Sequence, residues 1–556
     1  MARRGEPEHP ELLTRAEHSR WTETSRHAEV EMFCAALAHR SRRVRLLSMG
    51  RSGEGRDMPV LVLASGGAFT PEAARRKRRA VVLVQANIHA GEVEGKEAVL
   101  MLARDLALAP REPAILRRLT LVLVPDFNPD GNDRISTRNR ALDLKRLEGQ
   151  IGPSGGVGTR YTGAGWNLNR DHVKQDAVET RNMARLNNQW DPHLVVDCHT
   201  TDGSIHGYDL TFDTSHNLSS GFMVPALWVR WNFLQAVARR LLRRTGIRTN
   251  WYGNFVDESD PAKGWMTYPA LPRFGSHYRG LRGRCDVLLE TYSYIGFEAR
   301  CRAMRETLRT LLEEAARRAR KIRSLCALED RETVERGLDP RPYGDVGVNY
   351  GVARRGEDGE LLFDYPARQG GWIDIRSVDP ASVRRHRLPG MRGVRRRTYR
   401  CRDMHIFVPT VSVPRPFGWL APPDLGPRLE GHGIRFERLG RRGALDAEAS
   451  VVLAIEKTHS PDVAGPVPAA GEAEVTPKTP RPPKRWETVL SVRRERRRAK
   501  FPAGTLLVPA GQPLGNLALH LLEPESDDGF ARWGFLDDSI RVGEPFPVWR
   551  LPRPLS

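Results

Sequence analysis

The feature that most constrains the fold is an alternation of short apolar runs with helix-like stretches between residues 21 and about 325. Five runs are rich in Val and Leu, and they cover residues 58–64, 80–87, 119–125, 193–199 and 286–292. Continuous apolar runs of this length are typical of strands buried on both faces of a sheet. Helices are expected between them at about 97–107, 178–188 and 225–244. The pattern predicts an α/β fold, in which helices flank a mixed central sheet.

The organisation changes towards the C-terminus. Apolar residues from Phe297 to Ile322 fall at spacings of three and four, which indicates a last amphipathic helix. Beyond about residue 330, short strand-like pieces are broken by Pro and Gly, so we expect a β-rich region. The expected units are a tail (1–20), an α/β domain (21–328), a β-rich accessory region (329–457), a Pro-rich linker (458–485) and a C-terminal segment (486–556) that packs back on the body.

The formal net charge of +20 raises the question of nucleic-acid binding, because clustered Lys and Arg are the usual footprint of phosphate recognition. Of the 88 basic residues, 10 are lysine and 78 are arginine, and they are spread along the chain rather than gathered in one tract. A coding bias towards arginine explains this composition better than a phosphate-binding surface does. No nucleic-acid partner is therefore expected.

Three further features concern the location of the protein. The six cysteines lie far apart without a CxxC pair, which indicates reduced, buried thiols. No stretch approaches the roughly 20 uncharged apolar residues that a membrane-spanning helix needs. The first residues carry two arginines but no apolar segment behind them, so a cytoplasmic protein is expected. If the start codon lies elsewhere, a secreted or periplasmic location is the alternative.

A candidate metal-binding pair follows the run at residues 80–87. His89 and Glu92 are three residues apart where a strand ends and a helix begins. This spacing lets an imidazole nitrogen and a carboxylate oxygen point at one ion, and such ligands suit Zn²⁺. An HxxE pair by itself is a weak signal, because the same spacing also occurs by chance on solvated turns.

Two more strand ends strengthen the metal-site interpretation. His199 ends the run at 193–199, and ligands in α/β sheets bind at the carboxyl ends of strands. Asp197 could orient a ligand imidazole, although a capping carboxylate explains it equally well. Glu290 ends the run at 286–292 and could serve as a base, the alternative being a salt bridge to an arginine.

The order of these motifs resembles the M14 family of zinc carboxypeptidases. The chain carries His89 and Glu92, an Asn-Pro-Asp-Gly turn at 128–131, Arg160, a Leu-Asn-Arg segment at 168–170, then His199 and finally Glu290. The resemblance covers roughly residues 20 to 325. It implies a carboxypeptidase-like catalytic domain with one zinc ion per chain, held by His89, Glu92 and His199.

The resemblance also implies roles for further residues. Arg160 would polarise the scissile carbonyl, and Asn169 and Arg170 would hold the terminal carboxylate of the substrate. A guanidinium group suits both tasks, since it binds carboxylates through two parallel hydrogen bonds. Glu290 would take a proton from the zinc-bound water and pass it to the leaving amine.

The family places a tyrosine upstream of the catalytic glutamate. Tyr268 and Tyr278 both lie in range, and Tyr278 is chosen here because its neighbours are polar. The chain also departs from the digestive carboxypeptidases. Asn167 stands where the usual residue is Asp, an insertion precedes Arg160, and a long region follows the catalytic domain.

The predicted function is zinc-dependent hydrolysis of a C-terminal peptide bond, and the expected partner is a peptide or amide substrate with a free carboxylate. One alternative is a zinc amidase that acts on another carboxylate-bearing amide, such as a cell-wall peptide or an N-acyl amino acid. A less favoured alternative is a non-catalytic protein that binds an acidic partner through the basic clusters at 394–400 and 493–500. Because no motif lies beyond residue 330, that region is expected to be separable from the zinc site.

Overall fold

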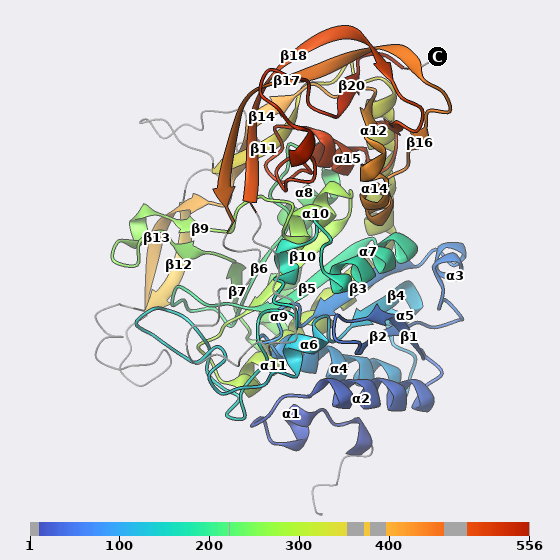
Figure 1. The fold of residues 1–556 in the computed structure, drawn as a ribbon. Coiled ribbons are helices and arrows are strands. Elements are labelled where there is room, and N and C mark those ends of the chain that lie inside the picture. Colours follow the sequence, from blue (N-terminus) through green and yellow to red (C-terminus); the bar gives the residue numbers. More distant parts are fainter. Residues whose placement is uncertain (1–9, 222, 353–371, 379–395, 461–485, 555–556) are drawn as a thin grey trace, which may run out of the picture.

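The computed structural model describes residues 10–221, 223–352, 372–378, 396–460 and 486–554 (Figure 1). The helices are η1 (Pro10–Leu12), α1 (Arg15–His18), α2 (His27–Arg40), α3 (Pro71–Arg76), α4 (Glu94–Ala107), α5 (Ala114–Arg118), α6 (Pro129–Asn132), η2 (Leu168–Arg170), α7 (Val178–Trp190), α8 (Val224–Trp228), the π-helical η3 (Val229–Phe233), α9 (Leu234–Thr245), η4 (Pro261–Lys263), α10 (Gly275–Leu281), α11 (Phe297–Arg317), α12 (Ala319–Leu338), η5 (Pro423–Leu425), α14 (Gly426–His432), α15 (Gly515–Leu522) and η6 (Asp537–Ser539).

The strands are β1 (Val44–Arg51), β2 (Asp57–Leu63), β3 (Ala80–Ala86), β4 (Leu119–Val124), β5 (Leu194–Thr200), β6 (Leu210–Asp213), β7 (Thr249–Trp251), β8 (Asn254–Phe255), β9 (Trp265–Met266), β10 (Cys285–Thr291), β11 (Val346–Val352), β12 (Trp372–Val378), β13 (Arg396–Met404), β14 (Phe407–Val413), β15 (Gly418–Ala421), β16 (Glu437–Arg438), β17 (Gly443–His459), β18 (Trp486–Phe501), β19 (Leu506–Pro509) and β20 (Trp549–Leu551).

An eight-stranded mixed sheet forms the centre of the α/β part. Its strand order is β1-β2-β4-β3-β5-β10-β6-β7. The middle strands β4, β3, β5 and β10 run parallel to one another, whereas β1, β2 and β6 join antiparallel. The five apolar runs of the sequence form β2, β3, β4, β5 and β10. The predicted fold class, a mixed sheet flanked by helices, is therefore confirmed.

Helices cover both faces of this sheet (Figure 1). Val82 and Val84 of β3 pack into a core with α2, α4, α9 and α11, whereas Val81 and Leu83 pack into a second core with α3 and α7. Alternate residues of a strand point to opposite faces, so a strand covered on both faces must be apolar throughout. This explains why the runs show no polar alternation.

Two predicted helices are interrupted in the structure. The helix expected at 225–244 consists of α8, the π-helical turn η3 and α9. The last amphipathic helix ends at Arg317, and α12 then continues to Leu338 with a non-helical Arg318 between them. The apolar spacing runs through both breaks, so periodicity alone does not reveal them.

The C-terminal region is rich in strands, as expected. Its six-stranded sheet has the order β16-β19-β15-β20-β17-β18, so strands from before and after residues 461–485 lie in one sheet. A second sheet joins β12 and β13 to β9 and β8 of the α/β part. The predicted linker lies largely at 461–485, outside the described residues, and its first two residues belong to β17.

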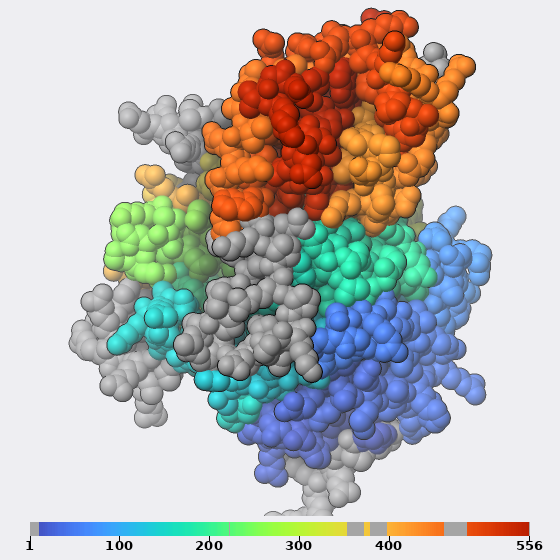
Figure 2. Space-filling view, viewed as in Figure 1, coloured from blue at the N-terminus to red at the C-terminus, as the bar shows by residue number. Residues whose placement is uncertain are grey.

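The C-terminal region packs directly on the α/β part. In Figure 2 its orange to red surface meets the teal surface of the segment around α7. The apolar core of the region includes Val173, Tyr278 and Leu281 from the α/β part. All six cysteines are buried free thiols. Within the described ranges, we find no helix that combines the length and the apolar character needed to cross a membrane.

Candidate metal centre and active site

Three strand ends bring the candidate residues together. Glu290 on β10 is the register partner of His199 on β5, and β5 pairs in parallel with β3, whose chain continues to His89. The chain leaves β3 through Asn87, which has a φ of 63° and donates from Nδ2 to Asp126 Oδ1 at 2.7 Å. Asn tolerates this left-handed conformation better than most residues. The turn allows the following residues to fold back over the end of β5.

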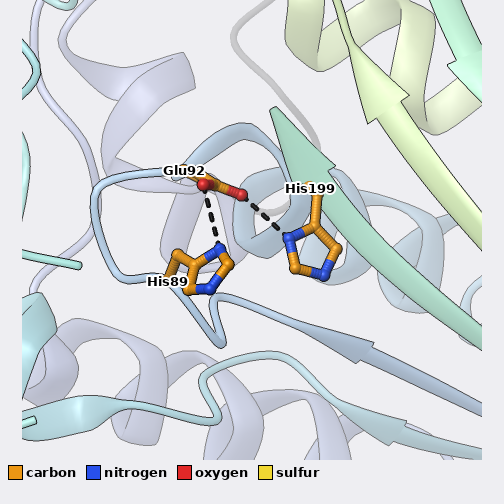
Figure 3. A group of neighbouring side chains, drawn as sticks. All are labelled: His89, Glu92 and His199. Atoms are coloured by element: carbon orange, nitrogen blue, oxygen red, sulfur yellow. Dashed lines mark hydrogen bonds and ion pairs between the residues drawn. The ribbon is translucent and has the colours of Figure 1, made fainter. Parts of the chain in front are cut away.

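His89, Glu92 and His199 form a compact, buried group (Figure 3). The Glu92 carboxylate lies between the two imidazole rings, with Oε1 3.0 Å from His89 Nδ1 and Oε2 3.0 Å from His199 Nδ1. Candidate ligand atoms of all three residues lie within 4.8 Å of one another. Two imidazoles and one carboxylate are a common ligand set of catalytic zinc, which keeps a further position open.

The second ring nitrogens of both histidines face other polar groups. His89 Nε2 lies 3.3 Å from Asn167 Oδ1, and His199 Nε2 lies 3.1 Å from Asp197 Oδ1. Arg279 holds Asp197 from the other side, with Nη2 3.1 Å from Oδ2. Metal-binding histidines usually place their second nitrogen against such acceptors, which fixes the ring and leaves the first nitrogen for the metal. The residues present therefore fit a zinc ion held through both Nδ1 atoms.

The three candidate ligands differ in their electrostatic environment. Burial raises the pKa of Glu92, but the nearby histidines and Arg140 outweigh burial and hold this pKa well below its usual range. Burial and the charge of Arg160 lower the pKa of His89 to about 3, so its imidazole is neutral. For His199, burial lowers the pKa, but Asp197 and Glu92 outweigh burial and instead hold this pKa well above its usual value. A metal ion bound through His199 would therefore replace a proton.

Glu290 has the environment of a poised acid or base. It is 8% exposed and lines the same cavity as the three candidate ligands. Burial raises the pKa of Glu290 to about 8, and the negative charges of Glu92 and Asp202 act in the same direction, against His199. A carboxyl group whose pKa lies close to neutrality can both accept and return a proton during one reaction.

Two arginines approach Glu92 from the cavity side. Arg160 Nη1 lies 3.3 Å from Glu92 Oε1 and 3.2 Å from His89 Nδ1, so the predicted Arg160 is at the site. Arg140 Nη1 lies 3.2 Å from the same Glu92 oxygen, and its Nη2 donates to the carbonyl of Thr201 at 3.0 Å. The sequence gives no reason to single out Arg140, because nothing in its spacing separates it from the neighbouring arginines.

Asn169 and Arg170 also line the cavity that contains Glu290 and the three candidate ligands. They lie in the short turn η2, where Asn169 Oδ1 accepts a hydrogen bond from the Gly275 amide at 3.1 Å. The Arg170 guanidinium lies over the ring of Phe274, with Cζ 4.2 Å from the ring centroid. The turn η2 and the start of α10 thus hold these two side chains together.

The cavity that contains all these residues has a volume of about 860 Å³. Besides the candidate site residues, Tyr252, Tyr268, Leu271 and Leu288 contribute to its wall. A cavity of this size is in the range of small-molecule and peptide-binding sites. The inserted segment before Arg160 also lines it, through Glu148 and Gly149.

The structure corrects the choice of tyrosine. Tyr278 lies on α10 and is buried against the C-terminal region, where its hydroxyl lies 2.7 Å from His432 Nδ1. It does not line the cavity, because the helix turns this side chain towards α14. Tyr268 does line the cavity, and its hydroxyl oxygen is buried. The polarity of neighbouring residues was therefore a misleading criterion.

Parts of this chain are similar to known proteins in sequence or in structure. Residues 30–220 match the family model described as zinc carboxypeptidase. Carboxypeptidase 2 of Trichophyton rubrum is 23% identical over 535 residues, which cover 90% of this chain and 81% of that protein. Human carboxypeptidase D is 33% identical over 150 residues, covering 24% of this chain and 10% of that protein. A metallo-carboxypeptidase structure from Burkholderia cenocepacia has a TM-score of 0.38 at 17% identity, covering 52% of this chain and 68% of that one.

A buried His-Glu-His group at the carboxyl ends of a mixed sheet, next to a strand-end glutamate, is an arrangement typical of metal-dependent hydrolases. The family-model match at residues 30–220 and the relatives named carboxypeptidase support placing this part of the chain in the zinc carboxypeptidase family, and with it an enzyme of the metallocarboxypeptidase type.

Proposed function

We propose that this protein removes a C-terminal residue from peptides by zinc-dependent hydrolysis, with Glu290 as the base. One observation carries the proposal: the His-Glu-His group, Glu290 and the Asn169–Arg170 pair line one cavity. A metal group by itself fits many hydrolases. Arg170 in the same cavity adds a site for a carboxylate, which restricts the substrate to an amide close to a free carboxyl group.

His89, Glu92 and His199 would hold the zinc ion, which when bound acts as a Lewis acid towards water and the substrate carbonyl. Glu290 then takes a proton from the attacking water and returns it to the departing amine. A nearby positive charge favours the ionised form of Glu290 and so lowers its pKa from the value of about 8. This change increases the fraction of Glu290 that can accept a proton at neutral pH.

Arg160 stabilises the negative charge that develops on the carbonyl oxygen. Its side chain is 31% exposed and borders the cavity, so it remains accessible to substrate. Arg140 is buried more deeply and holds Glu92 and the end of β5 in place. A fixed guanidinium group near a developing oxyanion lowers the free energy of the transition state more than that of the ground state.

Asn169 and Arg170 bind the terminal carboxylate of the substrate. Because Asn169 Oδ1 already accepts from Gly275, the side-chain NH₂ group of Asn169 remains as a donor. The Phe274 ring under Arg170 orients the guanidinium plane and supplies a favourable cation–π contact. Two parallel hydrogen bonds from such a fixed arginine select a carboxylate over a neutral amide.

Hydrolysis of matched peptides tests the proposal. Each peptide is prepared with a free and with an amidated C-terminus, and kcat/KM is measured for both forms on protein of known zinc content. We expect the free-acid form to be cleaved at its last peptide bond at least 100-fold faster. Equal cleavage of both forms by the zinc-loaded protein would instead support the amidase alternative.

A further inference from the structure

The C-terminal region contacts the carboxylate-binding end of the cavity through several polar groups. Arg428 Nη1 donates to the carbonyl of Lys174 at 2.5 Å, and His432 Nε2 lies 3.1 Å from the carbonyl of Val173. Both carbonyls belong to the irregular segment that follows Arg170. In the described chain this segment lies in no strand, so its shape depends on contacts of this kind.

Trp533 of the C-terminal segment also contacts Lys174. It is 1% exposed, and its indole Nε1 donates to Asp528 Oδ1 at 2.7 Å. Two cations lie against its ring: Lys174 Nζ is 4.1 Å from the ring centroid, and Arg273 Cζ is 4.4 Å from it. Cation–π contacts are strongest where water is excluded, as it is around this residue.

Each of the two cations is connected to a different part of Arg170. Lys174 Nζ donates to the carbonyl oxygen of Arg170 itself. Arg273 lines the cavity and directly precedes Phe274, the residue whose ring supports the Arg170 guanidinium. The C-terminal segment holds Arg273 through Glu487, 2.7 Å from Nη1, and through Asp528, 3.1 Å from Nε. Trp533 therefore supports Arg170 in two ways. Lys174 connects it to the Arg170 backbone, and Arg273 connects it to the residue under the Arg170 guanidinium.

The buried lysine depends on these contacts for its charge. Lys174 is 1% exposed, and burial lowers the pKa of its ammonium group to about 8, although Asp171 acts in the opposite direction. A buried ammonium group needs compensating acceptors or an aromatic face to stay protonated. The ring of Trp533 and the carbonyl of Arg170 supply such partners at one position.

We infer that Trp533, acting through Lys174 and Arg273, is a positioning residue that orients Arg170 for the terminal carboxylate of the substrate. The inference rests on the proposed function, because it assumes that Arg170 binds that carboxylate. It makes the last part of the chain a component of substrate recognition. Removal of the indole should weaken carboxylate binding and leave the metal group intact.

The test compares Trp533→Leu with Trp533→Phe, which keeps an aromatic face but loses the hydrogen bond to Asp528. The readouts are kcat and KM on the matched peptides, the inhibition constant of 3-phenylpropionate as a simple carboxylate, and zinc content. For Trp533→Leu we expect a rise of at least tenfold in KM for the free acid and in the inhibition constant. We expect kcat to change less than threefold, and Trp533→Phe to recover most of the loss.

Two further variants make the result decisive. Lys174→Met keeps the size of the side chain but removes the ammonium group, and it should show the same selective loss even if Trp533→Leu does not fold. Trp549→Leu is the matched control, because Trp549 also contacts an arginine, Arg497, but lies outside the cavity. It should behave like wild type.

The outcomes separate the inference from the function on which it rests. If wild type cleaves free-acid and amidated peptides equally, the proposed carboxylate recognition itself fails. If wild type prefers the free acid but Lys174→Met keeps the wild-type KM and inhibition constant, the positioning role is overturned. Equal loss on both peptides, with zinc retained, would likewise show general destabilisation of the site rather than positioning.

Discussion

Glu290 lies directly beside His199, because the two residues are register partners in the parallel pair of β10 and β5. Both residues therefore lie at the same edge of the sheet, although 90 residues of chain separate them. The backbone ladder fixes the distance between the proposed base and a proposed zinc ligand. A site of this kind is rigid because it is built on strands rather than on a mobile loop.

The metal group gives the first testable expectation. Purified protein should contain about one zinc ion per chain, because two imidazoles and a carboxylate leave room for one catalytic ion. His199→Ala should lose this zinc, since two remaining ligands bind too weakly. Metal analysis by mass spectrometry checks the stoichiometry, with His39→Ala, an exposed residue of α2, as the control. Full zinc occupancy in His199→Ala would show that the ligands are assigned incorrectly.

Glu290→Gln separates the base from the metal group. The amide has nearly the same shape but cannot accept a proton from water, so kcat should fall by a factor of about 100 to 10,000. Zinc content and melting temperature should remain at the wild-type values. Glu298→Gln, on the surface of α11, is the control. A kcat close to wild type in Glu290→Gln would place the base elsewhere in the cavity.

Arg170→Ala tests the recognition of the carboxylate. It should reduce kcat/KM for the free-acid peptide by about 2–4 kcal/mol, the cost of losing one partner of a desolvated charge pair. The amidated peptide should be affected far less, so the preference for a free C-terminus should nearly vanish. The two kcat/KM values measured side by side decide the matter. An equal loss on both peptides would contradict this role of Arg170.

Tyr268 and Tyr278 provide a matched pair of variants. Tyr268→Phe removes the buried hydroxyl of a residue that lines the cavity, and it should lower kcat/KM by about 3- to 10-fold if this group bonds to substrate. Tyr278→Phe removes a hydroxyl that contacts His432, so it should affect melting temperature rather than kinetics. The reverse pattern would restore Tyr278 as the residue that acts on substrate.

The raised pKa of Asp171 should contribute to the pH dependence of stability. It is buried, accepts a hydrogen bond from the Ala177 amide at 2.9 Å, and has a pKa that burial raises to about 6. Because this pKa exceeds the unfolded value of 3.8, the folded state binds the proton more tightly. The stabilisation is thus present below about pH 4 and is lost as the pH rises through 6.

Urea unfolding between pH 4 and pH 7 measures this effect. The free energy of unfolding of wild type, relative to Asp171→Asn, should fall by on the order of 3 kcal/mol over this range, since one pKa unit corresponds to about 1.4 kcal/mol. The amide of Asp171→Asn stays neutral at every pH, so other titrating groups cancel in the difference. Parallel curves for the two proteins would mean that Asp171 has an ordinary pKa in the folded state.

One expectation drawn from the sequence stays a prediction, although the structure shows contacts that bear on it. The region beyond residue 330 was expected to be separable from the zinc site, because it carries no catalytic motif. In the structure, Glu487 and Asp528 bind Arg273 of the cavity wall, and Arg428 binds the segment after Arg170. Contacts between residues more than 200 positions apart leave no local pattern in a sequence.

The sequence by itself determined the central sheet and the chemistry at its edge. Continuous apolar runs mark strands that are covered on both faces, and a polar residue at the end of such a run marks a site. His89, His199 and Glu290 were found in this way. Glu290 lies beyond the residues that match the family model, so its strand-end position was the signal in the chain itself.

Only the tertiary structure decided which other side chains reach the cavity. Tyr268 and Tyr278 look alike in sequence, but a helix turn directs Tyr278 away from the cavity and into the C-terminal core. Arg140 contacts Glu92, and Trp533 contacts Lys174 beside Arg170. Both contacts join residues that are far apart in the sequence. The physical reason is that periodicity encodes which face of an element is buried, whereas the packing partner of that face depends on the whole chain.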